Sequence, residues 1–387
     1  MPEIPVKNCC GCTACYNACK SGAIKMRPSD EGFLYPEVIK ALCVNCGRCE
    51  SVCPVNHPPL LNEEYIGYVT QSQDDGLLSQ STSGGFMDAL YKYVLDDLGG
   101  LAAGVAFDKC FLPKHIIVDS YDAAKAFRNS KYAQSDLGDV FSQIKKLLSD
   151  GKTVLFVGTP CQVGGLKAFL YKEYDNLITA DLVCRSVPSP LLWRKYLDFQ
   201  ESRYRSKVRS AAFRKKTYGY HSGTLEIVFE NGKRYNGSNR VDYYMKAFHG
   251  DKCSRRSCYS CDFKTEHRCS DFTVFDCWRP EQVSNCTKDN DKGFSNVIIH
   301  SNKGKEIFEN LKNINCFEAD VQKMFCFTGG MESASISYTE DREHFYSDLE
   351  NLGFEKGVKK HVKVTVKDRL IESAKPLRYH IKGLLKK

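Results

Sequence analysis

The chain has 387 residues, 42% hydrophobic and 26% charged, the balance of an ordinary globular protein with two or three domains. No apolar run is long enough to cross a bilayer, and the start MPEIPVKNCCGC lacks the apolar core of a secretory signal, so we expect a cytoplasmic protein. Of the net charge of +8, residues 356–387 carry +9 and residues 1–355 carry −1, which argues against a nucleic-acid-binding body.

Two cysteine runs of the same spacing lie near the start of the chain. Both follow the pattern C-x2-C-x2-C-x3-C, and Pro54 follows the second run. This is the spacing of bacterial dicluster ferredoxins, in which three thiolates bind one [4Fe–4S] cluster and the fourth binds the other. Zinc sites and a disulfide knot are the alternatives, but zinc favours paired C-x2-C units and a reducing cytosol disfavours disulfides. Lys20 replaces the proline that usually follows the first run.

The crossed pattern predicts the ligands of each cluster. We assign one cluster to Cys9, Cys12, Cys15 and Cys53, and the other to Cys43, Cys46, Cys49 and Cys19. Cys10 is an additional thiol that we interpret as a non-ligand.

A proline-rich connector over residues 54–64 leads to a predicted strand, YIGYVTQS, and then to a helix. Phe86, Leu90, Val94 and Leu98 recur at helical spacing before Gly99-Gly100 ends the helix. The sequence STSGG stands at its amino end, where it either caps the helix or lets a phosphate approach the backbone amides.

A strand–helix–strand unit is predicted over residues 153–183, with the helix near 162–172. Cys161 and Cys184 each follow a strand, so both are expected at the carboxyl edge of a parallel sheet. With the pair Cys258 and Cys261 they would make a third [4Fe–4S] site; a zinc clip or unrelated buried cysteines are the alternatives. Four further cysteines are competing ligands by their position: Cys253, Cys269, Cys277 and Cys286.

Two basic stretches follow different patterns. Residues 203–216 carry seven cations and no acid, typical of either a solvated face or an anion-binding one. The segment 356–387 mixes cations with Leu370, Ile371, Leu377, Ile381 and Leu384, so it is expected to contact an anionic membrane surface or a protein, or to be a loosely packed tail interrupted by Pro376.

The motifs STSGGF, SKYAQS, GTPCQVGGLK, DLVCRSVPSP, CYSCDF and SDFTVFDCW occur in that order. Over residues 1–330 the chain therefore resembles the coenzyme F420 hydrogenase/dehydrogenase beta-subunit family fused to a dicluster ferredoxin. The resemblance implies flavoproteins that pass electrons between FAD and iron–sulfur clusters, and it assigns the third cluster to Cys161, Cys184, Cys258 and Cys261. It implies FAD contacts at Ser83, Gly84, Gly85, Ser130, Lys131, Tyr132 and Ser135. Cys277 before the tryptophan departs from the family pattern.

We expect an α+β protein: a dicluster ferredoxin-like domain (1–60), an α/β flavin-binding domain in two parts (61–150 and 151–340) and a basic tail (341–387). The predicted function is an oxidoreductase that exchanges hydride with coenzyme F420 or another small molecule, with Lys131 as the candidate catalytic contact. The alternative is an electron-relay subunit without its own substrate, serving a partner enzyme such as one of polysaccharide biosynthesis. A redox partner protein or ferredoxin is expected, and nucleic acid is not.

Overall fold

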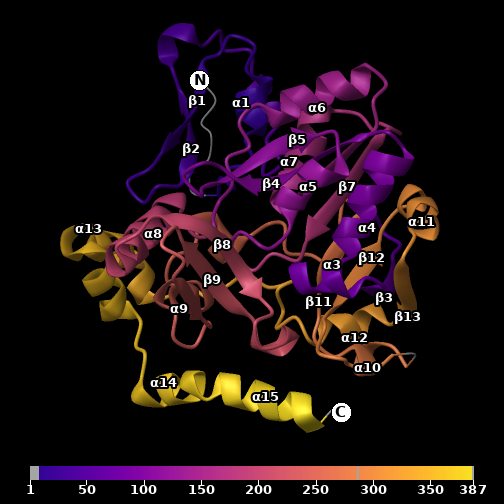
Figure 1. The fold of residues 1–387 in the computed structure, drawn as a ribbon. Coiled ribbons are helices and arrows are strands. Elements are labelled where there is room, and N and C mark those ends of the chain that lie inside the picture. Colours follow the sequence, from indigo (N-terminus) through magenta and orange to yellow (C-terminus); the bar gives the residue numbers. More distant parts are fainter. Residues whose placement is uncertain (1–7, 286, 386–387) are drawn as a thin grey trace.

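The computed structural model describes residues 8–285 and 287–385. A large mixed sheet forms its centre, as Figure 1 shows. Its strands lie in the order β13-β3-β12-β11-β7-β6-β4-β5, and β4, β6, β7 and β11 run parallel. The strands are β3 (Ile66–Ser72), β4 (Leu101–Phe107), β5 (Pro113–Val118), β6 (Val154–Gly158), β7 (Leu177–Leu182), β11 (Phe272–Cys277), β12 (Phe294–Ile299) and β13 (Ile314–Ala319).

Helices cover both faces of this sheet because its central strands are apolar on both sides. Leu155 and Val157 pack against one helix layer, and their neighbours Val154 and Phe156 pack against the other. The first layer includes α4 (Phe86–Lys92), the π-helical turn Tyr93–Asp97, α5 (Tyr121–Ala124) and α11 (Asn302–Glu309). The second consists of α1 (Ala14–Ala18), α6 (Val140–Ser149) and α7 (Pro160–Leu170). The predicted strand–helix–strand unit is thus β6-α7-β7, with β6 and β7 parallel.

A separate group of helices and strands packs beside the sheet, around a core rich in aromatic side chains. It contains α8 (Pro190–Tyr204), the antiparallel strands β8 (Val208–Lys215), β9 (Thr224–Phe229) and β10 (Arg234–Gly237), α9 (Tyr243–His249) and α13 (Glu340–His361). Trp193 of α8 lies at its centre, stacked on Tyr196 and against Phe213 of β8.

The N-terminal domain is small and has its own hairpin. It holds α1, β1 (Ile24–Pro28), β2 (Leu34–Val38), the 3-10 turn Lys40–Leu42 and α2 (Arg48–Ser51). Ala14 of α1 is fully buried against α6 and α7, so this domain is packed onto the sheet domain rather than attached by its connector alone.

One predicted boundary, at the C-terminal segment, differs from the structure. The segments 61–150 and 151–340, predicted as two parts of one domain, both contribute strands to the large sheet. The stretch predicted as a basic tail begins within α13, and Phe345, Leu349 and Val358 of this helix are core residues. Only α14 (Val366–Ser373) and α15 (Lys375–Leu385) run as a bar along the lower edge in Figure 1.

The remaining short elements connect these layers. They are α3 (Asp75–Gln80), α10 (Pro280–Val283), α12 (Val321–Phe325) and the 3-10 turns Lys125–Phe127, Tyr220–Ser222 and Arg256–Ser260. Among the helices that the structure describes, none has the length and apolar character needed to cross a membrane.

Candidate metal centres

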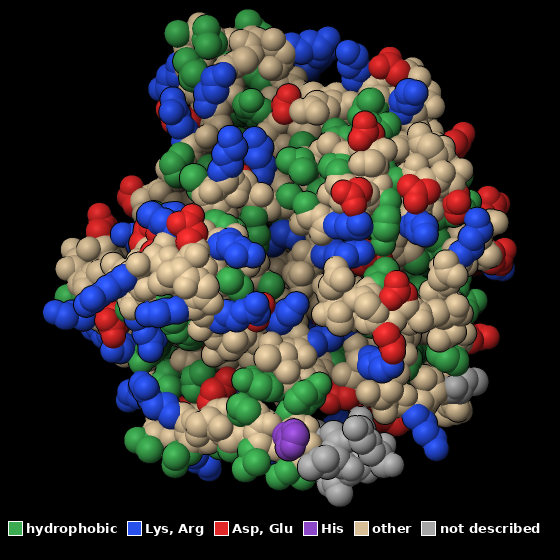
Figure 2. Space-filling view, viewed as in Figure 1, with side chains coloured by type: hydrophobic (Ala, Val, Ile, Leu, Met, Phe, Trp, Pro, Cys, Tyr) green, Lys and Arg blue, Asp and Glu red, His purple; other side chains and the backbone are tan. Residues whose placement is uncertain are grey.

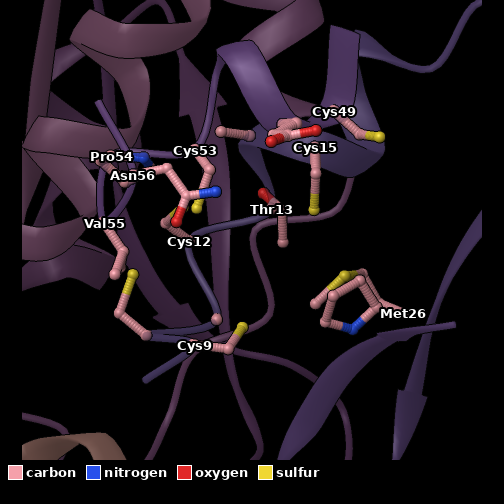
Figure 3. Close-up of a pocket in the computed structure, with 15 residues that line it drawn as sticks. Cys9, Cys12, Thr13, Cys15, Met26, Cys49, Cys53, Pro54, Val55 and Asn56 are labelled. Atoms are coloured by element: carbon pink, nitrogen blue, oxygen red, sulfur yellow. The ribbon is translucent and has the colours of Figure 1, made fainter. Parts of the chain in front are cut away.

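Four cysteines of the N-terminal domain surround a first hollow of about 500 Å³. They are the predicted ligands of one cluster: Cys9, Cys12, Cys15 and Cys53. Figure 3 shows them around one space, whereas the sulfur of Cys49 is turned away from it. The loop turns sharply at Gly11, which has φ +74°, and a Cβ there would lie 2.4 Å from the Gln134 side chain, so glycine is required.

A second hollow of about 380 Å³ is lined by the other predicted set: Cys19, Cys43, Cys46 and Cys49. Its loop turns at Gly47, with φ +72°, before α2 begins. Cys46 is exposed, so this hollow lies nearest the solvent among the three cysteine sites described. The structure thus brings together both cysteine sets of the crossed ferredoxin pattern.

A third hollow of about 600 Å³ is lined by Cys161, Cys184, Cys258 and Cys261. Cys161 lies in the first turn of α7, where Pro160 begins the helix and the Gln162 side chain accepts from the Thr159 amide at 2.9 Å. Cys184 follows β7, as its position after a parallel strand predicts, and the other two thiols come from the 3-10 turn Arg256–Ser260 and the residue after it. Three separate parts of the chain therefore present four thiols to one space.

Burial makes these thiols poor acids when no cation is near them. Burial, together with a smaller effect of the adjacent cysteines, raises the pKa of the Cys258 thiol to about 12 and that of Cys261 to about 11. Desolvation and then the neighbouring Cys258 also raise the pKa of Cys184. Because thiolates are the ligands of iron–sulfur clusters and metal binding favours deprotonation, this donor set fits a cationic cluster.

The spacing of the thiols is too wide for a single ion. In the described part of the chain, no three His, Cys, Asp or Glu side chains are close enough together to hold one metal ion. A zinc ion would hold four sulfurs at about 2.3 Å from one centre, whereas a four-iron cube separates its thiolates more widely. The described side chains therefore do not form a single-ion site at any of the three hollows.

Cys10 lies between the first and third hollows and lines both. Its thiol interacts with those of Cys12 and Cys161, and its pKa is raised, chiefly by the contact with Cys12. Helix α7 joins the same two sites, since a Cβ on Gly165 would lie only 2.7 Å from Cys12 Sγ. The first and third hollows are consequently neighbours across α7.

Arg255 is a site residue that the spacing of the cysteines did not reveal. Its side chain is fully buried, and Nε donates to the carbonyl oxygen of Cys9 at 2.7 Å. Nη1 donates to the carbonyl of Leu34 at 3.0 Å, and the guanidinium lies 3.9 Å from the Tyr35 ring. Arg255 precedes Cys258 by three residues, so one side chain fixes the first-site loop relative to a third-site ligand.

The glycine-rich segment predicted to contact FAD is packed against the sheet. Ser83 Oγ donates to the Phe294 carbonyl at 2.8 Å, and the Gly84 amide donates to Ser295 Oγ at 2.9 Å. A Cβ on Gly84 would lie 2.4 Å from the Thr70 carbonyl oxygen, which accounts for glycine there. Gly85, with φ +83°, begins α4.

The segment Ser130–Ser135 lies between that glycine-rich turn and the third hollow. The Ser130 amide donates to Thr82 Oγ1 at 3.3 Å, and Ser135 Oγ accepts from Gln162 of α7 at 3.0 Å. Tyr132 packs on Phe213 and Phe248. The Lys131 amine donates to four carbonyl oxygens of residues 126–129 at 2.9–3.2 Å, and burial lowers its pKa to about 7. Its contact with flavin or substrate stays a prediction.

Three arginines near this segment have a buried nitrogen without a hydrogen-bond partner among the described residues: Nε of Arg185, Nη2 of Arg214 and Nη2 of Arg255. Arg185 lines the third hollow, and Arg214 of β8 donates to Asp276 at 2.8 Å beside Trp278. Desolvation and then these two cations lower the pKa of His249 to about 4, so the three basic groups face one region. Figure 2 shows Lys and Arg side chains around a hollow near the centre of this face, between α8 and β8 and the side of α3 and α5.

The competing cysteines lie elsewhere in the fold. Cys253 and Cys277 are buried in two different hydrophobic cores, and Cys269 packs against a third. None of these three lines the third hollow, and Cys286 lies outside the described residues. The fold therefore brings the four predicted third-site cysteines together without these competitors, and Cys10 is the one further cysteine given in the lining of this hollow.

Comparison with known proteins gives two family matches. Residues 151–323 match the family of the C terminus of the "Coenzyme F420 hydrogenase/dehydrogenase, beta subunit", and residues 8–57 match the "4Fe-4S dicluster domain". The coenzyme F420-dependent sulfite reductase of Methanocaldococcus jannaschii is 25% identical over 316 residues, 77% of this chain and 45% of that protein. The chain thus spans about half the length of this curated relative.

A solved structure of the F420-reducing [NiFe] hydrogenase complex from Methanosarcina barkeri also matches, with 18% identity and a TM-score of 0.46. The match covers 76% of this chain and 90% of that one. The two family matches confirm the predicted resemblance and the predicted succession of a ferredoxin-type domain and an α/β domain of an oxidoreductase family.

Proposed function

We propose that this chain, which combines a 4Fe-4S dicluster domain with a domain of the coenzyme F420 hydrogenase/dehydrogenase beta-subunit family, is an iron–sulfur flavoprotein. In this proposal, electrons pass between the two ferredoxin-type sites, a third [4Fe–4S] site and FAD. The organic partner is coenzyme F420 or another molecule that exchanges hydride. A flavin exchanges two electrons as hydride with such a molecule, whereas a four-iron cluster carries one electron at a time.

The observation that carries the proposal is the series of three cysteine-lined hollows. Cys49 lines both the second and the first hollow, and Cys10 lines both the first and the third. A continuous row of adjacent sites is the arrangement that stepwise electron transfer requires. The exposed Cys46 supports a redox partner protein that docks at the second site.

The chain's own residues would hold the three hollows in fixed positions and would bind FAD next to the third hollow. Arg255 ties the Cys9 loop to the segment of Cys258, and α7 carries Cys161 at one end of its first two turns and packs on Cys12 at the other. The unpartnered guanidinium nitrogens of Arg185 and Arg214 support an anionic group of FAD beyond the third hollow.

The first test is the iron, sulfide and flavin content of the chain purified without oxygen. We expect roughly twelve irons per chain, four for each cluster, and one FAD. Cys161→Ser should lower the iron to roughly eight, because it removes a third-site ligand only. Cys253→Ala, which removes a buried cysteine away from the three hollows, is the matched control and should keep the full iron content. A wild-type content of roughly eight irons without flavin would refute the third site and FAD.

The flavin position has a test of its own. Arg214→Gln should lower the FAD content while keeping the iron, because it removes the unpartnered donor without touching a cysteine. Arg209→Gln is the control, since Arg209 lies on the same strand and is exposed. Equal flavin content in the two variants would move the proposed flavin site away from Arg214.

The substrate is tested by mixing the isolated chain with oxidised coenzyme F420 and a low-potential electron donor. Bleaching of the deazaflavin by the chain alone would support direct hydride exchange. Turnover that needs an added partner enzyme would instead favour a relay subunit, and it would leave the cluster assignments unchanged.

A further inference from the structure

The helices α14 and α15 form nearly one continuous helix, here called the strap (residues 366–385). Ala374, between them, keeps helical dihedral angles of φ −80° and ψ −11°. The Ala374 amide donates to the Leu370 carbonyl at 3.2 Å, and the Arg378 amide donates to the Ala374 carbonyl at 3.0 Å. Helical periodicity therefore holds across the break, although Pro376 lacks an amide donor.

The large apolar side chains of the strap are exposed along one line. Val366 is 74% exposed, Leu370 and Leu377 are each 64% exposed, and Ile381 is 46% exposed. At about 100° per residue, these four positions fall within about 60° of one another around the helix. We call this line the apolar stripe.

The polar side of the strap, not the apolar stripe, holds it to the body. Asp368 accepts from Lys246 at 3.2 Å, and Glu372 accepts from the Ser238 amide and hydroxyl at 3.0 and 2.6 Å. Tyr379 meets the ring of Tyr218 edge-on. At about 100° per residue, Asp368, Glu372 and Tyr379 lie about opposite the apolar stripe.

This orientation is the reverse of an ordinary surface helix, which buries its apolar stripe against the core. The space beneath the strap is a hollow of about 1850 Å³, so few contacts fix it. Figure 2 shows hydrophobic side chains along the strap at the lower edge of the molecule. An apolar line held outward needs a partner that covers it.

Charge indicates what that partner is. Lys367, Arg369 and Arg378 are exposed beside the apolar stripe, and residues 356–387 carry a net charge of +9. Amphipathic helices with cations flanking an apolar line lie in the headgroup region of anionic bilayers. We propose that the strap is a peripheral membrane-binding helix, which places its apolar stripe into the surface of an anionic lipid bilayer while its acidic side stays on the protein.

The test is flotation of the full chain with vesicles, one set of phosphatidylcholine alone and one of equal parts phosphatidylcholine and phosphatidylglycerol. We expect binding to the anionic vesicles that falls with added salt. Binding to the neutral vesicles should be at least roughly tenfold weaker than binding to the anionic ones. The double variant Leu370→Glu/Leu377→Glu should lower anionic-vesicle binding by roughly a hundredfold or more, because withdrawing each leucine from an apolar phase weakens binding by roughly tenfold or more.

Matched controls separate the stripe from general effects. Leu60→Glu introduces the same change at a residue that is 95% exposed in the connector, and it should bind like wild type. Circular dichroism and iron content should be equal in all variants. Wild-type chain that does not float with anionic vesicles at low salt would overturn the proposal, as would a stripe variant that floats equally well. The proposal would also be overturned if the wild-type chain were a dimer that does not bind vesicles and the stripe variant were a monomer, because the apolar stripe would then contact a second copy of the chain.

Discussion

Gly165→Ala would test the contact between α7 and the first cysteine site. An added Cβ would lie 2.6 Å from the Cβ and 2.7 Å from the Sγ of Cys12. Apolar atoms in contact are normally about 3.5–4.0 Å apart, so the helix or the Cys12 loop would have to move by about 1 Å. Neither moves freely, because Arg255 holds the adjacent Cys9 carbonyl and Ala14 is fully buried.

Two opposing energies decide the outcome of this change. Alanine favours the helix over glycine by about 1 kcal/mol. Overpacking costs about 1–3 kcal/mol, which gives a net destabilisation of up to about 2 kcal/mol. The larger effect is expected at the metal site, because Cys12 is one of its four predicted ligands. We therefore expect the purified variant to lose roughly four irons, with the electron paramagnetic resonance signal of one cluster missing.

The neighbouring Gly164→Ala gives a matched comparison. It brings the same gain in helix propensity, but its Cβ would meet the far edge of the Phe263 ring at 2.8 Å instead of a cysteine. We expect this variant to keep the first-site iron. If Gly165→Ala also retains full iron, unchanged spectra and a raised melting temperature, the rigid contact between α7 and Cys12 is refuted.

Three further changes test the surroundings of the sites. Arg342→Leu should destabilise the chain by about 3 kcal/mol in thermal melts, because Arg342 is fully buried and pairs with Glu31 at 2.5 Å; an unchanged melting temperature would show that this link between α13 and the N-terminal domain is dispensable. His115→Phe should reduce the loss of stability on acidification. Burial lowers the pKa of His115 to about 4, so the unfolded chain binds a proton first, and the wild-type free energy of unfolding falls from about pH 6.5 downwards, by up to about 3 kcal/mol at pH 4. If urea melts show that the free energy of unfolding falls equally in both proteins between pH 7 and 5.5, this account is contradicted. Cys10→Ala should retain all iron and sulfide, because at least four other cysteines line each hollow that it borders; loss of roughly four irons would make Cys10 a ligand.

The local parts of this site could be predicted from the sequence, whereas their assembly could not. The ferredoxin spacing needs only a loop and a short helix, and the position of Cys161 needs only β6 and the turn into α7. In contrast, no local pattern relates Arg255 to the carbonyl oxygen of Cys9, because 246 residues separate the two partners. The basic stretch 203–216 predicted either a solvated or an anion-binding face, and the structure divides it, with Arg209 exposed and Arg214 turned inward to Asp276.

The same limit explains the C-terminal segment. Its apolar and basic residues predicted a membrane contact, a protein contact or a loosely packed tail, since composition alone does not tell which side of a helix faces the protein. The rest of the protein decides which side is buried. Phe354 and Val358 of α13 pack into an apolar core, whereas the strap forms polar contacts with Lys246 and Ser238. Helices of similar charge therefore differ in what their apolar sides can reach.

The packing of the N-terminal domain bears on how electrons would enter and leave the chain. A mobile ferredoxin domain would shuttle, and its interface would be small and polar. Here Ala14 is buried against α6 and α7, and Arg255 and Arg342 are two of the largest fully buried side chains described, both bonded to the N-terminal domain. Such an interface fixes the distance between the first and third hollows. In the proposed function, electron exchange with a partner protein would take place at the exposed second site around Cys46, and the strap would hold that site at a constant orientation to a membrane surface.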